Sequence, residues 1–169
     1  MSNFENSANQ SMSTSQYFLG KIYSANQNDS IASCYLGMQY YIDEDIPRDI
    51  NKSVYYLTLA SNQYQPNVQC FLGCLYLLEE RVYNVNKGVY YLKLASNQIF
   101  VLAQVNLGYI YWRDIFVQQN IDLAISYSTL AASHNNVYAH YYLGLIYYSD
   151  KYNKKGVDQN NKKSKKSKK

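Results

Sequence analysis

The segment NKSVYYLTLASNQ, Asn51 to Gln63, returns 35 residues later as NKGVYYLKLASNQ, Asn86 to Gln98. Eleven of the thirteen positions are identical in the two copies. A fixed period of this length is the sequence signature of a repeat protein, in which short units stack along one direction. The repeated segment therefore decides the fold class before any single residue is interpreted.

A Leu-Gly pair recurs with the same period. The pairs begin at Leu36, Leu72, Leu107 and Leu143, so their spacings are 36, 35 and 36 residues. We interpret each unit as two helices: an A helix, which carries the Leu-Gly pair, and a B helix, which carries the repeated segment. A tyrosine always follows the leucine by four residues, so that both side chains share one helix face. The glycine beside them allows another helix to approach closely.

The helical periods predict about eight helices in antiparallel pairs and no strand. Asp49, Asn84 and Asn120 stand at equivalent positions before the B helices, and each is a residue type that favours an N-cap. The expected helices cover about 13–25, 31–42, 49–63, 67–80, 85–98, 101–113, 121–134 and 137–149.

The expected fold is an all-α, right-handed α-α superhelix over residues 13–151, with a disordered leader, 1–12, and a disordered Lys-rich tail, 152–169. The solenoid divides into a degenerate N-terminal half-repeat, three repeats and a partial repeat. The half-repeat covers residues 13–30, and the partial repeat covers residues 139–151. The three full repeats cover about 32–67, 68–102 and 103–138.

Charge is distributed unevenly along the chain. The formal net charge is +4, yet residues 154–169 alone contain eight lysines and one aspartate. A slightly acidic domain therefore precedes a basic tail. The sequence has no apolar run that could span a membrane and no secretory signal. Three cysteines, Cys34, Cys70 and Cys74, indicate thiols in a reducing compartment, so we expect a cytoplasmic protein, or a nuclear one if the Lys-rich tail acts in import.

The two helices of each unit resemble a known family, the Sel-one-like repeats, which are relatives of the tetratricopeptide repeat. The matching segments are ASCYLGMQY with KSVYYLTLAS, and AQVNLGYIY with LAISYSTLAA. The resemblance covers about residues 28–150. It implies a tetratricopeptide-like helical solenoid that acts as an adaptor or scaffold for other proteins rather than as an enzyme.

The residues themselves show no nucleophile–base pair, phosphate loop or metal motif. The two histidines, His134 and His140, lie around the last B–A connection, where a cation at a helix end suits the helix dipole. We therefore expect no catalytic residue, no cofactor, no metal and no small-molecule substrate.

The face of the A helices opposite the Leu/Tyr face is unusually apolar and aromatic. By analogy with the tetratricopeptide repeat, this face lines a concave groove, and an apolar stripe there suggests a protein partner. The alternative is that neighbouring A helices or a dimer mate bury the stripe. The candidate groove residues are Tyr41, Cys74, Leu77, Tyr109, Trp112, Leu145 and Tyr148.

An acidic residue ends every A helix. An acid at this end opposes the helix dipole, so helix propensity does not select it. One interpretation is an acidic rim that selects a basic partner; the other is a helix end in the left-handed conformation, which Asp tolerates. The four residues are Asp43, Glu79, Asp114 and Asp150.

Two functions follow as hypotheses. The first is a protein-binding scaffold that holds a partner segment in the concave groove. The alternative is a nucleic-acid-associated or nuclear protein that acts through the basic tail, Lys162–Lys169.

Overall fold

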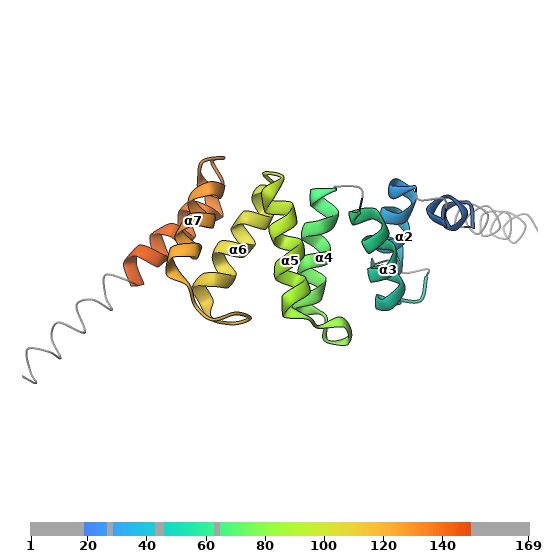
Figure 1. The fold of residues 1–169 in the computed structure, drawn as a ribbon, viewed down its shortest axis with the longest axis horizontal. Coiled ribbons are helices and arrows are strands. Elements are labelled where there is room, and N and C mark those ends of the chain that lie inside the picture. Colours follow the sequence, from blue (N-terminus) through green and yellow to red (C-terminus); the bar gives the residue numbers. More distant parts are fainter. Residues whose placement is uncertain (1–18, 27–28, 43–45, 63–64, 150–169) are drawn as a thin grey trace, which may run out of the picture. The chain divides into compact units, whose positions relative to one another are not determined.

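The computed structural model of the chain describes residues 19–26, 29–42, 46–62 and 65–149. All regular structure in these ranges is helical, which confirms the all-α class (Figure 1). The expected leader, 1–12, and tail, 152–169, lie outside the described residues. The named elements are α2 (Ser30–Ile42), α3 (Ile50–Ser61), α4 (Pro66–Leu78), the short 3-10 helix η1 (Glu80–Val82), α5 (Val85–Asn97), α6 (Val101–Arg113) and α7 (Ile121–Ala132). Residues 19–26 and 137–149 are also helical.

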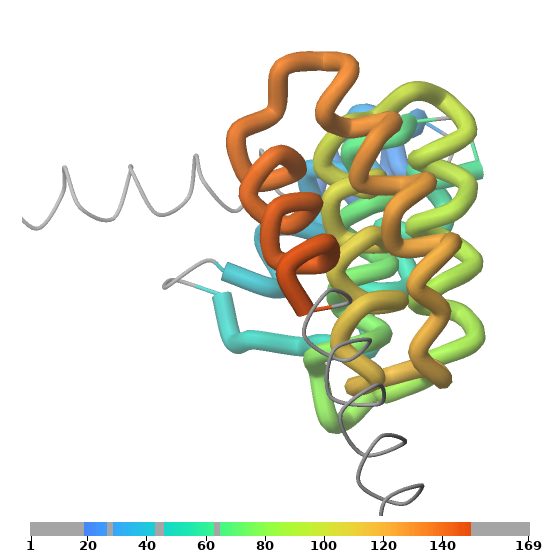
Figure 2. Tube along the Cα trace, turned by 90° about the vertical axis from the view of Figure 1, so that its left-hand side faces the viewer, coloured from blue at the N-terminus to red at the C-terminus, as the bar shows by residue number. Residues whose placement is uncertain are grey.

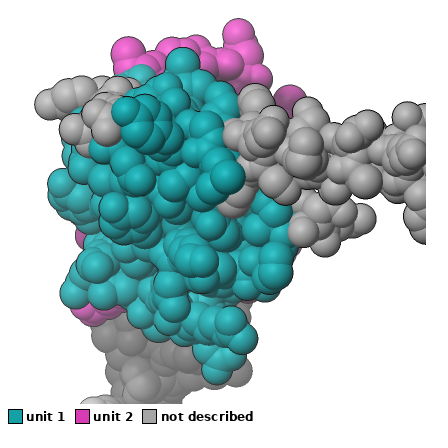
Figure 3. Space-filling view, turned by 90° about the vertical axis from the view of Figure 1, so that its right-hand side faces the viewer, with its two compact units in different colours: residues 1–98 teal, residues 99–169 magenta. Residues whose placement is uncertain are grey.

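The helices pack in sequential pairs, α2 with α3, α4 with α5 and α6 with α7, as the repeat predicted (Figures 1 and 2). The chain divides into two compact units, residues 1–98 and 99–169, which Figure 3 colours separately. None of the described helices has the length and apolar composition of a membrane span.

The Leu-Gly pairs form the contact inside each helix pair. Leu36, Leu72 and Leu107 are completely buried. A Cβ placed on Gly37 would lie 2.5 Å from the Leu57 side chain, and one on Gly73 would lie 2.9 Å from the carbonyl oxygen of Gly88. These glycines are required because the B helix passes too close for any side chain.

All three expected N-caps are present. Each side-chain oxygen accepts a hydrogen bond from the backbone N–H three residues later: Asp49 from Lys52 at 3.0 Å, Asn84 from Lys87 at 3.0 Å, and Asn120 from Leu123 at 2.9 Å. These bonds pair N–H groups that the first helical turn leaves without an intrahelical partner.

The tyrosine after each Leu-Gly pair joins the two helices of its repeat in two ways. Its ring stacks nearly parallel on a B-helix tyrosine, with centroid distances of 5.8, 5.8 and 5.9 Å for Tyr40–Tyr56, Tyr76–Tyr91 and Tyr111–Tyr127. Its carbonyl oxygen accepts a hydrogen bond from the backbone N–H of the B-helix cap, at 2.9, 2.8 and 2.9 Å in the same order. In these three repeats, the end of the A helix and the start of the B helix are therefore held together in the same way.

Candidate partner-binding site

In the first unit, the apolar stripe on the A helices is largely covered. Tyr41 is half-buried, and its ring meets Phe71 edge-on at a centroid distance of 5.3 Å. Cys34 and Met38 also pack against the core that contains Leu72. In this unit, neighbouring helices therefore cover much of the stripe.

Leu77 does not belong to an exposed groove. It is only 4% exposed, and its side chain fills the space above Gly88, where an added Cβ would lie 2.6 Å from Leu77 Cγ. The equivalent B-helix positions carry Ser53 and Ala124. Because Gly88 is the smallest of the three residues, the Leu77 side chain has room to pack against α5. The prediction that Leu77 lines an exposed groove was therefore wrong.

The Glu79 side chain is bound to two residues of the first unit, Arg48 and Tyr41. Its Oε1 accepts hydrogen bonds from Arg48 Nη2 at 2.5 Å and from the Tyr41 hydroxyl at 3.1 Å. The Arg48 guanidinium also lies 4.9 Å from the centroid of the Tyr41 ring. The Glu79 carboxylate is therefore already paired with Arg48, which precedes α3, and this weakens the idea of an acidic rim at this point.

Asp114 ends α6 in the left-handed conformation, with φ 53° and ψ 35°. Its side chain accepts a hydrogen bond from the backbone N–H of Gln119 at 2.9 Å. This geometry favours the second interpretation of the acidic positions, a carboxylate that shapes the connection after the helix. Asp43 and Asp150 lie outside the described residues.

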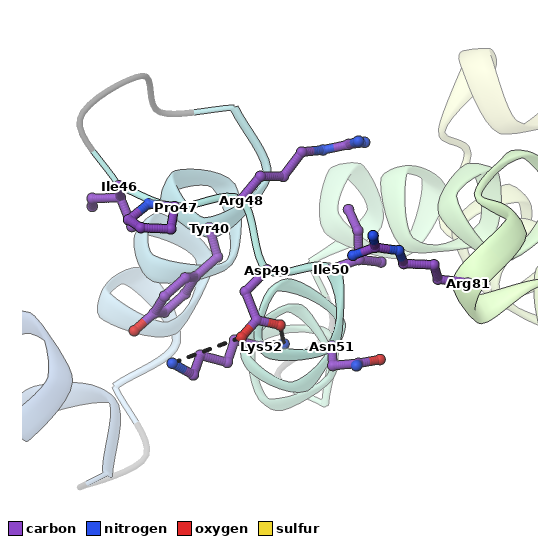
Figure 4. A pocket seen from close by; sticks show the side chains of 9 residues that line it. All are labelled: Tyr40, Ile46, Pro47, Arg48, Asp49, Ile50, Asn51, Lys52 and Arg81. Carbon is purple, nitrogen blue, oxygen red and sulfur yellow. Dashed lines mark hydrogen bonds and ion pairs between the residues drawn. The ribbon is translucent and has the colours of Figure 1, made fainter.

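A hollow that the sequence did not indicate lies beside the start of α3, with a volume of about 520 Å³ (Figure 4). Lys52 pairs with Asp49 at 3.7 Å, while Arg81 reaches in from η1. Since Asp49 already caps α3, its carboxylate occupies the place that an anion would take at this helix start. The lining residues are Tyr40, Ile46, Pro47, Arg48, Asp49, Ile50, Asn51, Lys52 and Arg81.

The second unit carries an aromatic cluster, which we define as Tyr109, Trp112, Tyr141 and Tyr142. The Tyr142 ring lies 5.3 Å from Tyr109, 6.2 Å from Trp112 and 5.7 Å from Tyr141, measured between centroids. Burial, followed by the neighbouring tyrosines, raises the pKa of the Tyr142 hydroxyl. The cluster joins α6 to the helix at 137–149 and places two predicted groove residues, Tyr109 and Trp112, against each other.

Part of this surface is open to solvent. Tyr141 is 59% exposed and Tyr148 is 61% exposed, whereas Tyr109, Trp112 and Leu145 are half-buried. Exposed aromatic rings backed by half-buried ones form an apolar surface of the kind that anchors protein partners. The stripe predicted from the sequence contains Tyr109, Trp112, Tyr141, Leu145 and Tyr148 but not Tyr142, which directly follows Tyr141 in the sequence.

The three cysteines, all described, are thiols without a disulfide. A hydrogen bond with Cys70 lowers the pKa of the Cys74 thiol, against a smaller opposing effect of burial, whereas burial raises the pKa of Cys34. No group of three or more His, Cys, Asp or Glu side chains in the described ranges is placed to hold a metal ion.

These opposite shifts predict the order in which the thiols react. The thiolate is the reactive form, so Cys74 should be alkylated by iodoacetamide faster than Cys34 near neutral pH, although both are half-buried. Timed alkylation followed by peptide mass spectrometry would measure both rates. Faster modification of Cys34 would contradict the expectation, and Cys70, which is 2% exposed, serves as the protected reference.

Comparison with known proteins identifies one family, and two of the similar solved structures are described below. A family model described as Sel1 repeat matches residues 30–64, 66–99, 101–136 and 137–166. A crystal structure of a Sel1 repeat protein from Oxalobacter formigenes superposes with a TM-score of 0.63 at 23% identity, covering 75% of this chain and 96% of that one. A protective antigen of uropathogenic Escherichia coli that displays an SLR fold superposes with a TM-score of 0.68 at 23% identity, covering 78% of this chain. The chain spans 29% of the length of that antigen. No curated protein matches the sequence.

Proposed function

Because the chain belongs to the Sel1 repeat family, we propose that it is a non-catalytic scaffold that binds a segment of a partner protein on the A-helix face of its second unit. Repeats of this family commonly mediate protein interactions. The proposal adds the place where the partner binds: the aromatic cluster together with Leu145 and Tyr148.

The observation that supports the proposal is the exposure of Tyr141 and Tyr148 on the helix whose Tyr142 packs against the half-buried Tyr109 and Trp112. Tyrosine and tryptophan are enriched among residues that dominate binding energy, because they bury a large area with few rotatable bonds and keep a polar group for hydrogen bonding. The half-buried Tyr142 ring packs against the exposed Tyr141 ring, which limits its motion and so reduces the entropy lost on binding.

Aromatic contacts, rather than an acidic rim, should dominate this binding. Asp114 is used in the connection after α6, and the Arg113 guanidinium lies 5.3 Å from the Trp112 ring centroid. Opposite charges therefore flank the cluster at the end of α6. We expect an apolar or aromatic partner segment and a binding affinity that changes little with salt, since salt screens charge pairs and leaves apolar burial intact.

The test replaces the exposed rings and leaves the half-buried ones. The double variant Tyr141→Ser and Tyr148→Ser should weaken partner binding by at least about 30-fold, which corresponds to roughly 2 kcal/mol for a hot spot, with little change in the melting temperature. The partner would first be captured with the wild-type chain and identified by mass spectrometry, and its dissociation constant would then be measured by calorimetry.

A matched control is the double variant Tyr55→Ser and Tyr90→Ser. These tyrosines are 56% and 57% exposed on the B helices α3 and α5, so the same chemical change is made away from the proposed site. Equal losses of affinity in the two double variants would refute the placement of the site in the second unit. Replacing Tyr109 and Trp112 is the poorer test, because both help to pack the cluster.

A further inference from the structure

Two of the three cysteines stand one helical turn apart on α4. Cys70 and Cys74 are four residues apart inside the helix Pro66–Leu78, so their side chains share one face. The two thiols are joined by a hydrogen bond. Cys70 is 2% exposed and Cys74 is half-buried, so the pair reaches solvent through Cys74. The structure therefore places two sulfur atoms within hydrogen-bond distance of each other, with solvent access at one of them.

The helix that carries the two thiols is fixed on another face by its contact with α5. Leu72 is completely buried, and a Cβ on Gly73 would lie 2.9 Å from the Gly88 carbonyl oxygen. Rotation or local unwinding of α4 would break this contact. Cβ atoms four residues apart on a helix are about 5–6 Å apart, whereas a disulfide requires about 3.5–4.5 Å. The pair therefore cannot form a disulfide without distorting α4, and both sulfur atoms stay available as ligands.

We propose that Cys70 and Cys74 bind one Cu(I) ion as a two-coordinate site. Thiolates are the ligands that soft metal ions such as Cu(I) prefer in proteins. Cu(I) accepts two thiolates in a nearly linear arrangement. Two sulfur–metal bonds of about 2.3 Å, the length known for zinc, would set the sulfur atoms about 4.5 Å apart. Cβ atoms one helical turn apart allow this separation after a small rotation of each side chain.

The number of ligands excludes the other common thiolate-bound metals. A structural zinc site takes four ligands, and no group of three or more His, Cys, Asp or Glu side chains in the described part of the chain is placed to supply them. An iron–sulfur cluster takes four cysteines, and the sequence has three. The expectation of no metal followed from the absence of such motifs, but a two-coordinate ion needs no third ligand.

Binding replaces two sulfur–hydrogen bonds by two sulfur–copper bonds and releases two protons, while the copper remains Cu(I). The hydrogen bond from the neighbouring thiol supports this step, because it lowers the pKa of Cys74 and so favours the first thiolate. The complex carries one negative charge, which solvent reaches through the half-buried Cys74. The two cysteines belong to the first unit and lie outside the aromatic cluster, so this inference does not depend on the proposed function.

The test measures Cu(I) binding to the full chain under nitrogen, in competition with the coloured chelator bicinchoninate. The wild type should bind one Cu(I) per chain, with an affinity that rises with pH because protons compete for the thiolates. Cys70→Ser and Cys74→Ser should each weaken binding at least about 100-fold, beyond the usual effect of losing an outer-shell group of a metal site. Cys34→Ser is the matched control: it also replaces a half-buried thiol and should leave the affinity unchanged.

A second measurement needs no substitution. One equivalent of Cu(I) should protect Cys74 of the wild type from iodoacetamide, while Cys34 in the same chain continues to react. Equal protection of both thiols would overturn the proposal and assign the binding to adventitious contact with single thiols. Wild-type affinity in Cys74→Ser, which changes only a half-buried position, would overturn it as well. So would one Cu(I) per two chains together with a dimer in size-exclusion chromatography, since the ligands would then come from two copies.

Discussion

Replacing Gly73 by alanine should lower the free energy of unfolding by about 1–3 kcal/mol, and replacing it by leucine should lower it further. The added Cβ would lie 2.8 Å from Leu92 Cγ, 2.9 Å from the Gly88 carbonyl oxygen and 3.1 Å from the Leu92 backbone nitrogen. A side-chain atom can move away, but the two backbone atoms belong to α5 and move only if the helix moves. Urea unfolding followed by circular dichroism would measure the loss.

Gly20→Ala is the matched control for this change. Gly20 also lies in a helix, at 19–26, but nothing in the described structure lies within 4 Å of its Cβ position. Since alanine favours the helix over glycine by about 0.5–1 kcal/mol, this variant should be slightly more stable than the wild type. If Gly73→Ala were as stable as Gly20→Ala, α4 and α5 would not be in contact at this glycine.

Two buried serines at the helix contacts should respond to the same substitution with opposite signs. Ser128 is completely buried, and its hydroxyl has no hydrogen-bond partner among the described residues. Ser53 is equally buried, but its hydroxyl donates to the Gly37 carbonyl at 2.7 Å. Ser128→Ala should therefore raise the free energy of unfolding by about 1 kcal/mol or more, because the variant no longer buries an unsatisfied hydroxyl. Ser53→Ala should lower it by about 0.5–1.5 kcal/mol, because a made hydrogen bond is lost.

Comparing Ser128→Ala with Ser53→Ala controls for the higher helix propensity of alanine. Alanine is the better helix former at both positions, by the same few tenths of a kcal/mol. The difference between the two variants therefore reports on the hydroxyl groups alone. Equal shifts in the urea midpoint would mean that the Ser128 hydroxyl is as well paired as that of Ser53.

The parts of this fold that are set by local chemistry could be predicted from the sequence. Asp49, Asn84 and Asn120 cap their helices because an N-cap needs only the right side chain before a helical segment. The Leu-Gly contacts were predictable because a glycine at a fixed position in every repeat implies that another helix passes close to it. The cap residues and the Leu-Gly pairs both recur in successive repeats, and this recurrence makes a chance occurrence improbable.

The candidate site was less predictable because it depends on contacts between different repeats. Leu77 is buried because the neighbouring helix has Gly88 where the other repeats have serine or alanine. In the sequence, this difference between the repeats was the one indication that Leu77 is buried. The pairing of Glu79 with Arg48 joins residues 31 positions apart, and no periodic pattern reveals it. Position on the helix face predicted that Tyr109 and Trp112 lie on the same side of α6, where their rings are 6.3 Å apart, but both rings also pack against Tyr142 of the following helix, which no periodic pattern reveals.

The close contact between each A helix and the B helix that directly follows it has a consequence for the kinetics of folding. The most extensive contacts between the named helices, α2 with α3, α4 with α5 and α6 with α7, each join neighbouring segments of the chain. Little loop-closure entropy is lost in forming them, so each pair can nucleate by itself, and folding should be fast for a chain of this length. Unfolding should then proceed pair by pair rather than in one cooperative step. The copies of the segment NKxVYYLxLASNQ in α3 and α5 would share nearly the same intrinsic helical stability, and any difference in their opening rates would report on the neighbours of each helix.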